Sequence, residues 1–242
     1  MTYYTGAVVA VPTVRKQEYI THAQTSWPLF NSYGATRMVE TWGTDVPRGT
    51  VTDFYGAVNA KDDETIVFSW IEWPDKATAD AAWEKMQSDP AVQHMPKIPF
   101  DGSRMIFGGF EPIMTSGSDQ GSYYQGFILA VPETNRTAYE KMAVDAWEGL
   151  FRKHGCLGIF ENWGLDIPHG QQTDFWRAAK ARDGEVPVFS WSVWPDKTTC
   201  DIAAKAMETE MAGQEFPEMP FDGMRMMWGG FDLVFDSGKS ES

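Results

Sequence analysis

The chain is short of positive charge. Among its 242 residues, 20 are Lys or Arg and 34 are Asp or Glu, which gives a formal net charge of −14 at pH 7. Proteins that bind nucleic acid or anionic lipid draw their affinity from clustered basic residues, and the few basic residues here do not cluster. We therefore expect no nucleic acid and no membrane as partners, and we interpret the acidity as a source of solubility.

Cysteine and long apolar runs are scarce too. Cys156 and Cys200 are the two cysteines, and neither has a partner at the spacing of a disulfide framework or a zinc site. No stretch approaches the roughly 18 apolar residues of a membrane span, and the first residues lack the basic and apolar regions of a secretory signal. The expected protein is cytoplasmic and holds no metal.

Histidine is rare, and the signatures of several enzyme classes are missing. The four histidines are His22, His94, His154 and His169, and a lone histidine is more often a surface residue than a ligand of haem or a metal. The sequence also lacks a phosphate loop, a dinucleotide fingerprint, a serine elbow and a His-Glu-Xaa-Xaa-His run. We therefore expect chemistry without a cofactor.

What the sequence does contain is an internal repeat. A long block returns 121 positions later, as Glu40 and Glu161 show (161 − 40 = 121). Ahead of this block the spacing is 120, as Tyr4 and Tyr124 show (124 − 4 = 120), so the second copy gained one residue between positions 147 and 150. None of the four histidines has a histidine at the matched position, which makes a symmetric haem or metal site improbable.

Each copy shows the same order of expected elements. An apolar strand at 4–11 is followed by a helix that Pro28 should kink or end early, because proline removes a helix hydrogen bond. A strand at 36–42 comes next, then two strands joined by a polar turn. They are expected at 52–60 and 66–73. A second helix with Asp75 as its N-cap and a final strand at 104–114 complete the copy.

The expected fold class is α+β. Helices on one face of each antiparallel sheet leave the other sheet face apolar, and two such faces are buried best against each other. The predicted units are residues 1–115 and 123–236, with a linker at 116–122 and a disordered tail at 237–242. The chain should therefore be a monomer that packs like a dimer, or a homodimer of such chains.

At this point the residues carry a resemblance. The first copy contains the strings GAVVAVP, VTDFYGAV, VFSWIEWPDK and PFDGSRMIFGGFEP, and the second contains GFILAVP, TDFWRAA, VFSWSVWPDK and PFDGMRMMWGGF. These resemble the small bacterial YbaA-like family, a domain of unknown function in the dimeric α/β-barrel, ferredoxin-like superfamily. The resemblance implies two ferredoxin-like repeats packed as a single-chain pseudo-dimeric α/β barrel. The wider superfamily includes lactone isomerases, cofactor-free monooxygenases, haem enzymes and ligand-binding regulators, so the fold leaves the activity open.

Glu40 is the first candidate catalytic residue. Strand alternation places it on one face with Met38 and Trp42. A carboxylate among such side chains has its charged form disfavoured, and a raised pKa suits a general base or acid near neutral pH. The alternative is a structural ion pair of Glu40 or Asp101 with Arg104, which we weigh above the catalytic interpretation.

Three further residues complete the predicted catalytic set. Glu72 shares a strand face with Phe68 and Trp70 but becomes Val193 in the second copy, which indicates either specialised halves or drift at an exposed position. Asp53 would assist the proton transfer, and Arg104 would steady developing negative charge.

The chain also has more large aromatic residues than a helix-covered sheet needs. Most should be core, and the rest should line a cavity for a small apolar or aromatic molecule. The predicted substrate-binding set is Trp42, Tyr55, Trp70, Phe107, Glu161, Trp163, Trp191 and Arg225.

We predict a cofactor-independent lyase or isomerase that moves a proton on such a molecule. The alternatives are a cofactor-free monooxygenase and a non-catalytic ligand-binding or stress protein. A fully packed lumen with Glu40 paired to Arg104 would argue against both enzymes, whereas an open cavity with an unpaired carboxylate would favour proton transfer.

Overall fold

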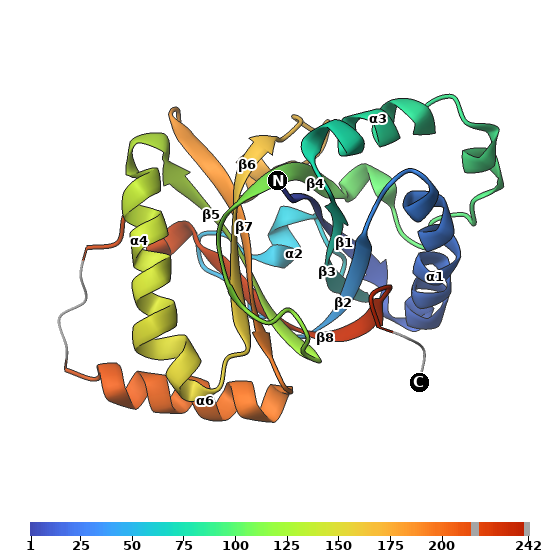
Figure 1. Ribbon diagram of the computed structural model, residues 1–242. Helices are drawn as coiled ribbons and strands as arrows, with labels where there is room; N and C mark the ends of the chain where they lie inside the picture. Colours follow the sequence, from blue (N-terminus) through green and yellow to red (C-terminus); the bar gives the residue numbers. More distant parts are fainter. Residues whose placement is uncertain (214–217, 240–242) are drawn as a thin grey trace.

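The computed structural model describes residues 1–213 and 218–239. Within these ranges, eight antiparallel strands close into a barrel, and the long helices lie outside it (Figure 1). The strands are β1 (Tyr3–Pro12), β2 (Arg37–Asp45), β3 (Glu64–Trp73), β4 (Ile106–Gly117), β5 (Tyr123–Pro132), β6 (Gly158–Asp166), β7 (Glu185–Trp194) and β8 (Met227–Asp236). The α-helices are α1 (Lys16–Ser32), α2 (Phe54–Ala57), α3 (Lys76–Met86), α4 (Arg136–Ala146), α5 (Phe175–Ala178) and α6 (Lys197–Met211).

The barrel consists of two copies of one sheet. The first copy has the order β4-β1-β3-β2 and the second has the order β8-β5-β7-β6. β2 pairs with β8 and β4 pairs with β6, so both edges of each sheet are covered by the other copy. The predicted α+β pseudo-dimeric barrel is therefore confirmed. Each four-stranded sheet has both of its edge strands paired only because the other sheet is present.

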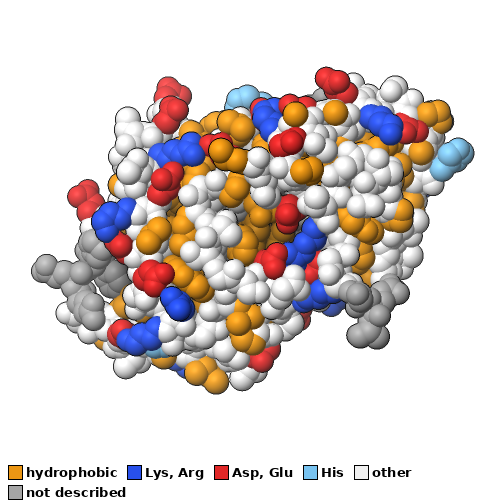
Figure 2. Space-filling view, viewed as in Figure 1, with side chains coloured by type: hydrophobic (Ala, Val, Ile, Leu, Met, Phe, Trp, Pro, Cys, Tyr) orange, Lys and Arg blue, Asp and Glu red, His pale blue; other side chains and the backbone are white. Residues whose placement is uncertain are grey.

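The helices cover the outside of the barrel on two sides. α1 and α3 lie on one side, and α4 and α6 lie on the other (Figure 1). No helix in the two described ranges is long and apolar enough to cross a membrane. Acidic and basic side chains are scattered over the visible face rather than gathered by sign, with hydrophobic side chains between them (Figure 2).

The lumen of the barrel is filled by side chains of both copies. Phe68 and Phe189 stack at its centre with ring centroids 4.2 Å apart and nearly parallel planes. Gly6 and Gly126 make this possible, because a Cβ on either would lie 2.9 Å or 2.8 Å from one of these rings. Both phenylalanines are fully buried. The lumen is therefore a packed hydrophobic core to which both copies contribute.

The prediction of a strand at 52–60 is wrong. Asp53 instead caps the short helix α2: one of its carboxylate oxygens accepts a hydrogen bond from the backbone N–H of Gly56 at 2.6 Å, and the other accepts from Gly49 at 3.0 Å. Asp174 caps α5 in the same way. The carboxylate satisfies amides that a strand would have paired with a neighbour, so each repeat has four strands rather than five.

The two copies differ most at the end of their first helix. α1 continues past Pro28 to Ser32, so the predicted early end is wrong; the proline is exposed, and water can solvate the carbonyl that loses its partner. In the second copy, α4 passes into a π-helical turn at Trp147–Phe151. This turn lies where the extra residue was inserted, because a π turn takes one more residue than an α turn.

The predicted disordered tail is wrong for residues 237–239. The Ser237 N–H donates to the carbonyl of Met38 at 3.0 Å, and the Lys239 ammonium donates to the carbonyl of Gly121 at 2.6 Å. Asp236 before them forms a two-pronged ion pair with Arg37, with both N–O distances at 2.8 Å. Residues 240–242 lie outside the described ranges.

Candidate functional site

Each repeat has an apolar cavity outside the barrel, between its helices and the outer face of its sheet. The first cavity, of about 460 Å³, lies between α1, α3 and strands β1 to β3. The second, of about 830 Å³, lies between α4, α6 and strands β5 to β7. Both volumes suit a small organic molecule. We call these spaces the first cavity and the second cavity.

A tyrosine, a glutamate and a serine meet on the wall of each cavity. In the first, the Tyr19 hydroxyl of α1 donates a hydrogen bond to Glu40 of β2, and Ser69 of β3 lies beside them. Ser69 stands directly opposite Glu40 in the β2–β3 ladder. Three elements of one repeat thus bring three polar groups together on an apolar wall.

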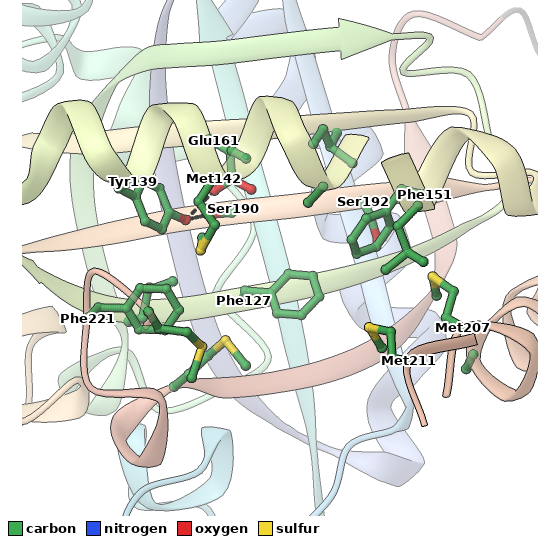
Figure 3. A pocket seen from close by; sticks show the side chains of 18 of the residues that line it. Phe127, Tyr139, Met142, Phe151, Glu161, Ser190, Ser192, Met207, Met211 and Phe221 are labelled. Atoms are coloured by element: carbon green, nitrogen blue, oxygen red, sulfur yellow. Dashed lines mark hydrogen bonds between the residues drawn. The ribbon is translucent and has the colours of Figure 1, made fainter. Parts of the chain in front are cut away.

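The second cavity repeats this arrangement. The Tyr139 hydroxyl of α4 donates to a carboxylate oxygen of Glu161 at 2.5 Å, and it lies 3.5 Å from the hydroxyl of Ser190. Figure 3 shows the tyrosine reaching from its helix to the glutamate, with Phe127, Phe221 and several methionines around the open space. The arrangement is therefore a property of the repeat and occurs twice.

The local backbone helps to present each glutamate. Beside Glu40 the register of β2 against β8 slips, so that Glu40 faces Phe235 whereas the next residue faces Leu233. Beside Glu161 the register of β6 against β4 slips in the same way. Such bulges bend a strand and re-aim its side chains, and here one lies next to each carboxylate.

Burial makes the Glu40 carboxyl a weak acid. The apolar surroundings disfavour its charged form and raise its pKa from 4.5 to about 7, although hydrogen bonds from Tyr19 and Ser69 hold the pKa below what burial alone would give. The pKa of Glu161 is raised for the same reason. At neutral pH a group with a pKa near 7 can both accept and return a proton.

The tyrosines remain protonated donors. Burial and the neighbouring carboxylate raise the pKa of Tyr19 well above its usual range, and the same two causes raise the pKa of Tyr139. Neither phenol therefore ionises near neutral pH. Each can hold a carboxylate in place through its O–H without competing as a base.

Arg104 and Asp53, two predicted catalytic residues, lie away from the cavities. Arg104 makes two parallel hydrogen bonds to Glu64, at 2.6 and 2.7 Å, and a third to Asp101 at 3.0 Å. The guanidinium and Glu64 are both buried. Hydrogen bonds from Ser103 and then from Arg104 lower the pKa of Asp101 to about 2. Asp53 is the helix cap described above. The predicted Asp101–Arg104 pair is present, whereas Glu40 hydrogen-bonds Tyr19.

Glu72 lies on the lumen side of the wall, the side opposite to Glu40. It stands across from Arg37 on β2, at the end of the barrel where Arg37 meets Asp236. Burial raises its pKa, and Arg37 partly offsets that effect. Tyr55 lies on α2 with the guanidinium of Arg48 over its ring at 3.9 Å. The structure brings neither residue to a cavity wall.

The other predicted binding residues divide between core and cavity. Trp70 and Trp191 stack with centroids 4.3 Å apart and reach the walls of the first and second cavities, respectively. Phe107 and Glu161 also line cavities. The remaining members serve packing or ion pairs elsewhere: Trp42 packs on Tyr19, Trp163 packs under Arg136, and Arg225 pairs with Glu185.

Sequence reasoning missed the hydroxyl partners of the glutamates. These partners are Tyr19 and Ser69, and neither belongs to the predicted site. The available signal was their repetition, since Tyr139 and Ser190 occupy the matched positions (139 − 19 = 120 and 190 − 69 = 121). Among the residues that the structure describes, no group of three His, Cys, Asp or Glu side chains is arranged to hold a metal ion.

Sequence comparison identifies relatives of both copies. The model of a family described as "Protein of unknown function (DUF1428)" matches residues 2–102 and again residues 122–223. The chain is 52% identical over 115 residues to "Uncharacterized protein YbaA" of Escherichia coli K12, which is 47% of this chain and 98% of that protein. The Shigella flexneri protein of the same name matches equally well.

Comparison of structures finds the same fold at low sequence identity. A "Putative monooxygenase" from Fusobacterium nucleatum has a TM-score of 0.54 and 9% identity, covering 97% of this chain and 93% of its own. An "anthrone oxidase-like protein" has a TM-score of 0.54 and 13% identity, with coverages of 97% and 92%. A "putative monooxygenase" from Lactobacillus acidophilus has a TM-score of 0.52 and 12% identity, with coverages of 97% and 95%. At such identities the likeness establishes the fold alone.

Proposed function

Because the chain belongs to the DUF1428 family, whose description states no activity, we propose a function from its cavities: proton transfer on a small apolar or aromatic carbon acid, as in a cofactor-independent isomerase or lyase. The observation that carries the proposal is the Glu40 carboxyl, which lies in an apolar cavity with a pKa of about 7. Glu161 offers the same chemistry in the second cavity.

The chemical step needs only the residues at hand. A substrate with an acidic C–H bond binds against the apolar wall, and the Glu40 carboxylate takes the proton, leaving the bonding electron pair delocalised in the substrate. The protonated carboxyl then returns the proton to another carbon of the same molecule, which completes an isomerisation. If the neighbouring carbon carries a leaving group, the electron pair expels it instead, which completes an elimination.

Tyr19 and Ser69 have a supporting role in this step. Their hydrogen bonds fix the carboxylate and keep its pKa near neutrality rather than higher. The apolar walls exclude water, which would otherwise lower the basicity of the carboxylate by solvating it.

A second candidate is oxygenation without a cofactor, which is favoured by the fold shared with proteins described as monooxygenases and as anthrone oxidase-like. It begins with the same deprotonation. The substrate anion then reacts with dioxygen, one C–O bond forms, the O–O bond breaks, and the products are a carbonyl group and water. For a CH₂ group the balance is CH₂ + O₂ → C=O + H₂O, so the substrate supplies all four electrons.

Anthrone provides an experiment that separates these possibilities, because it is a flat carbon acid with a CH₂ group. Under nitrogen in D₂O, proton transfer appears as deuterium entering that CH₂ group. In air, oxygenation appears as oxygen uptake with formation of anthraquinone. Exchange without oxygen uptake supports the isomerase or lyase, both together support the oxygenase, and binding without either process indicates a ligand-binding protein. Glu40→Gln, which keeps the shape of the side chain, should abolish either reaction in the first cavity.

A further inference from the structure

The two cavities differ at matched positions on their helix walls. His22 and Ser26 of α1 line the first cavity, whereas Met142 and Ala146 of α4 line the second (142 − 22 = 120 and 146 − 26 = 120). Two hydrogen-bonding side chains in one repeat are thus replaced by two apolar ones in the other. The Tyr-Glu-Ser arrangement that both cavities share does not require this difference.

The two polar groups have buried atoms without partners. Nδ1 of His22 and Oγ of Ser26 are buried and make no hydrogen bond within the described part of the chain, and Ser26 is only 3% exposed. A buried polar atom without a partner is costly, so native proteins rarely keep one without a reason. Two more such atoms lie on Asn162 and Trp191, which belong to the lumen side of the barrel wall, although Trp191 also reaches the second cavity.

The spacing of these groups relative to Tyr19 is fixed by the helix. Tyr19, His22 and Ser26 lie three and four residues apart and therefore share one helix face. With a rise of 1.5 Å per residue, His22 lies about 5 Å and Ser26 about 10 Å along the axis from Tyr19. Burial lowers the pKa of His22 below its usual range, so the ring is neutral and offers one donor and one acceptor.

A second difference concerns the mouth of each cavity. Trp83 of α3 lines the first cavity and packs on Phe30 and Phe107, with ring centroids 6.5 and 6.4 Å away. The matched residue on α6 is Ala204, which lines the second cavity (204 − 83 = 121). An indole is replaced by a methyl group, so the second cavity is the wider one.

The wall of the second cavity is also more adaptable. Its lining residues include five methionines, whose unbranched side chains can repack around different shapes: Met142, Met207, Met211, Met219 and Met226. Ser192 lies on this wall too, but its hydroxyl is engaged by Gln125 and the Trp194 indole. His22 and Ser26 of α1 therefore have no polar equivalent on the α4 wall of the second cavity.

We propose that the two cavities bind different classes of molecule. The first takes a compact aromatic molecule with a hydroxyl or carbonyl oxygen, which His22 and Ser26 bind about 5–10 Å along the axis of α1 from Tyr19. The second takes a larger, wholly apolar molecule. The proposal shares its cavities with the proposed function, but it concerns binding alone and stands even if Glu40 moves no proton.

The test uses the full-length protein with ¹³C-labelled methionine methyl groups, because each cavity has its own methionines. Met38 and Met105 report on the first cavity, and Met142, Met207 and Met211 report on the second. The first pair of probes is 1-naphthol and 1-methylnaphthalene, which have the same size and differ in one hydrogen-bonding group. Titration should show 1-naphthol binding to the first cavity about tenfold more tightly than 1-methylnaphthalene, and no such preference in the second.

Exchange variants give matched controls. His22→Met with Ser26→Ala should reduce the affinity of the first cavity for 1-naphthol about tenfold, a typical effect of losing one or two neutral hydrogen bonds, and should leave 1-methylnaphthalene within twofold. The reverse exchange, Met142→His with Ala146→Ser, should create the 1-naphthol preference in the second cavity. Because each variant must still bind 1-methylnaphthalene, a misfolded protein is recognised at once.

Pyrene tests the difference in size. It should perturb Met207 and Met211 but neither Met38 nor Met105. Ala204→Trp should lower its affinity for the second cavity at least tenfold, and Trp83→Ala should admit it to the first. The proposal is overturned if both cavities of the unaltered protein bind all three probes equally. It is also overturned if the exchange variants leave the affinity of each cavity for each probe unchanged. Glu40→Gln should retain the preferences of the two cavities for these probes, because the preferences do not depend on proton transfer. A failure of this proposal is therefore distinct from a failure of the proposed function.

Discussion

Replacing Glu40 by glutamine should make the protein's stability less dependent on pH. The folded state raises the pKa of this carboxyl from 4.5 to about 7, a difference of about 2.5. At about 1.4 kcal/mol for each pH unit, the folded protein favours the protonated form by about 3 kcal/mol. Glutamine resembles that protonated form at every pH.

The direction follows from proton binding. Between pH 4.5 and pH 7 the folded protein holds a proton at Glu40 that the unfolded chain has released, so stability falls as pH rises through this window. The contribution is fully present below pH 4.5 and is lost above pH 7. The free energy of unfolding of the Glu40→Gln variant should therefore increase relative to the unaltered protein by about 2–3 kcal/mol between pH 5 and pH 8.

Urea unfolding at pH 5, 6, 7 and 8 measures the free energy of unfolding of the variant and of the unaltered protein. Subtracting one from the other at each pH removes the contribution of all groups that titrate equally in both proteins. Glu84→Gln, at an exposed position on α3, controls for the loss of one negative charge. Glu161→Gln should change the difference in the same direction, since its pKa is raised by the same cause. A constant difference between Glu40→Gln and the unaltered protein across these pH values would refute the reasoning.

Three further outcomes are expected. Arg104→Ala should cost about 3–5 kcal/mol in urea unfolding, because it leaves the buried Glu64 carboxylate without its partner; a normal unfolding midpoint combined with lost activity would instead assign Arg104 to the chemistry. Tyr19→Phe should move the pKa of Glu40 above 7, because the lost hydrogen bond stabilises the charged form. A ¹³C NMR titration of the Glu40 carboxyl measures this pKa, and an unchanged titration midpoint would contradict the expectation. Phe68→Ala should destabilise the lumen by about 3–5 kcal/mol yet leave 1-methylnaphthalene affinity within twofold, whereas a large loss of affinity would place the ligand in the lumen.

The repeat in the sequence predicted two units packed sheet to sheet, although it placed a strand where α2 lies. Two apolar sheet faces are buried best against each other. The matched positions of Glu40 and Glu161 indicated a carboxylate that both copies share, but not that it lies outside the barrel. The insertion near residue 149 was also visible in the sequence, although its outcome as a π-helical turn was not, because spacing alone does not say how a helix absorbs an extra residue.

The composition of the site was harder to predict because its members come from separate elements. Glu64 begins β3, and its carboxylate binds Arg104 across 40 positions of sequence. This ion pair holds Arg104 away from the cavity carboxylates. Tyr19 reaches Glu40 across 21 positions. Strand alternation predicts which face a side chain takes, but not which helix residue lies above it, because that depends on how the helix packs on the sheet.

In the proposed function, the cavity carboxylates move a proton of a bound apolar molecule. The most direct test follows the loss of deuterium from anthrone labelled at its CH₂ group, under nitrogen in H₂O at pH 7. We expect rapid loss with the unaltered protein, slower loss with Glu40→Gln or Glu161→Gln, and the uncatalysed rate with both substitutions together. Equal rates for all four proteins, with anthrone bound in the cavities, would contradict the proposed function.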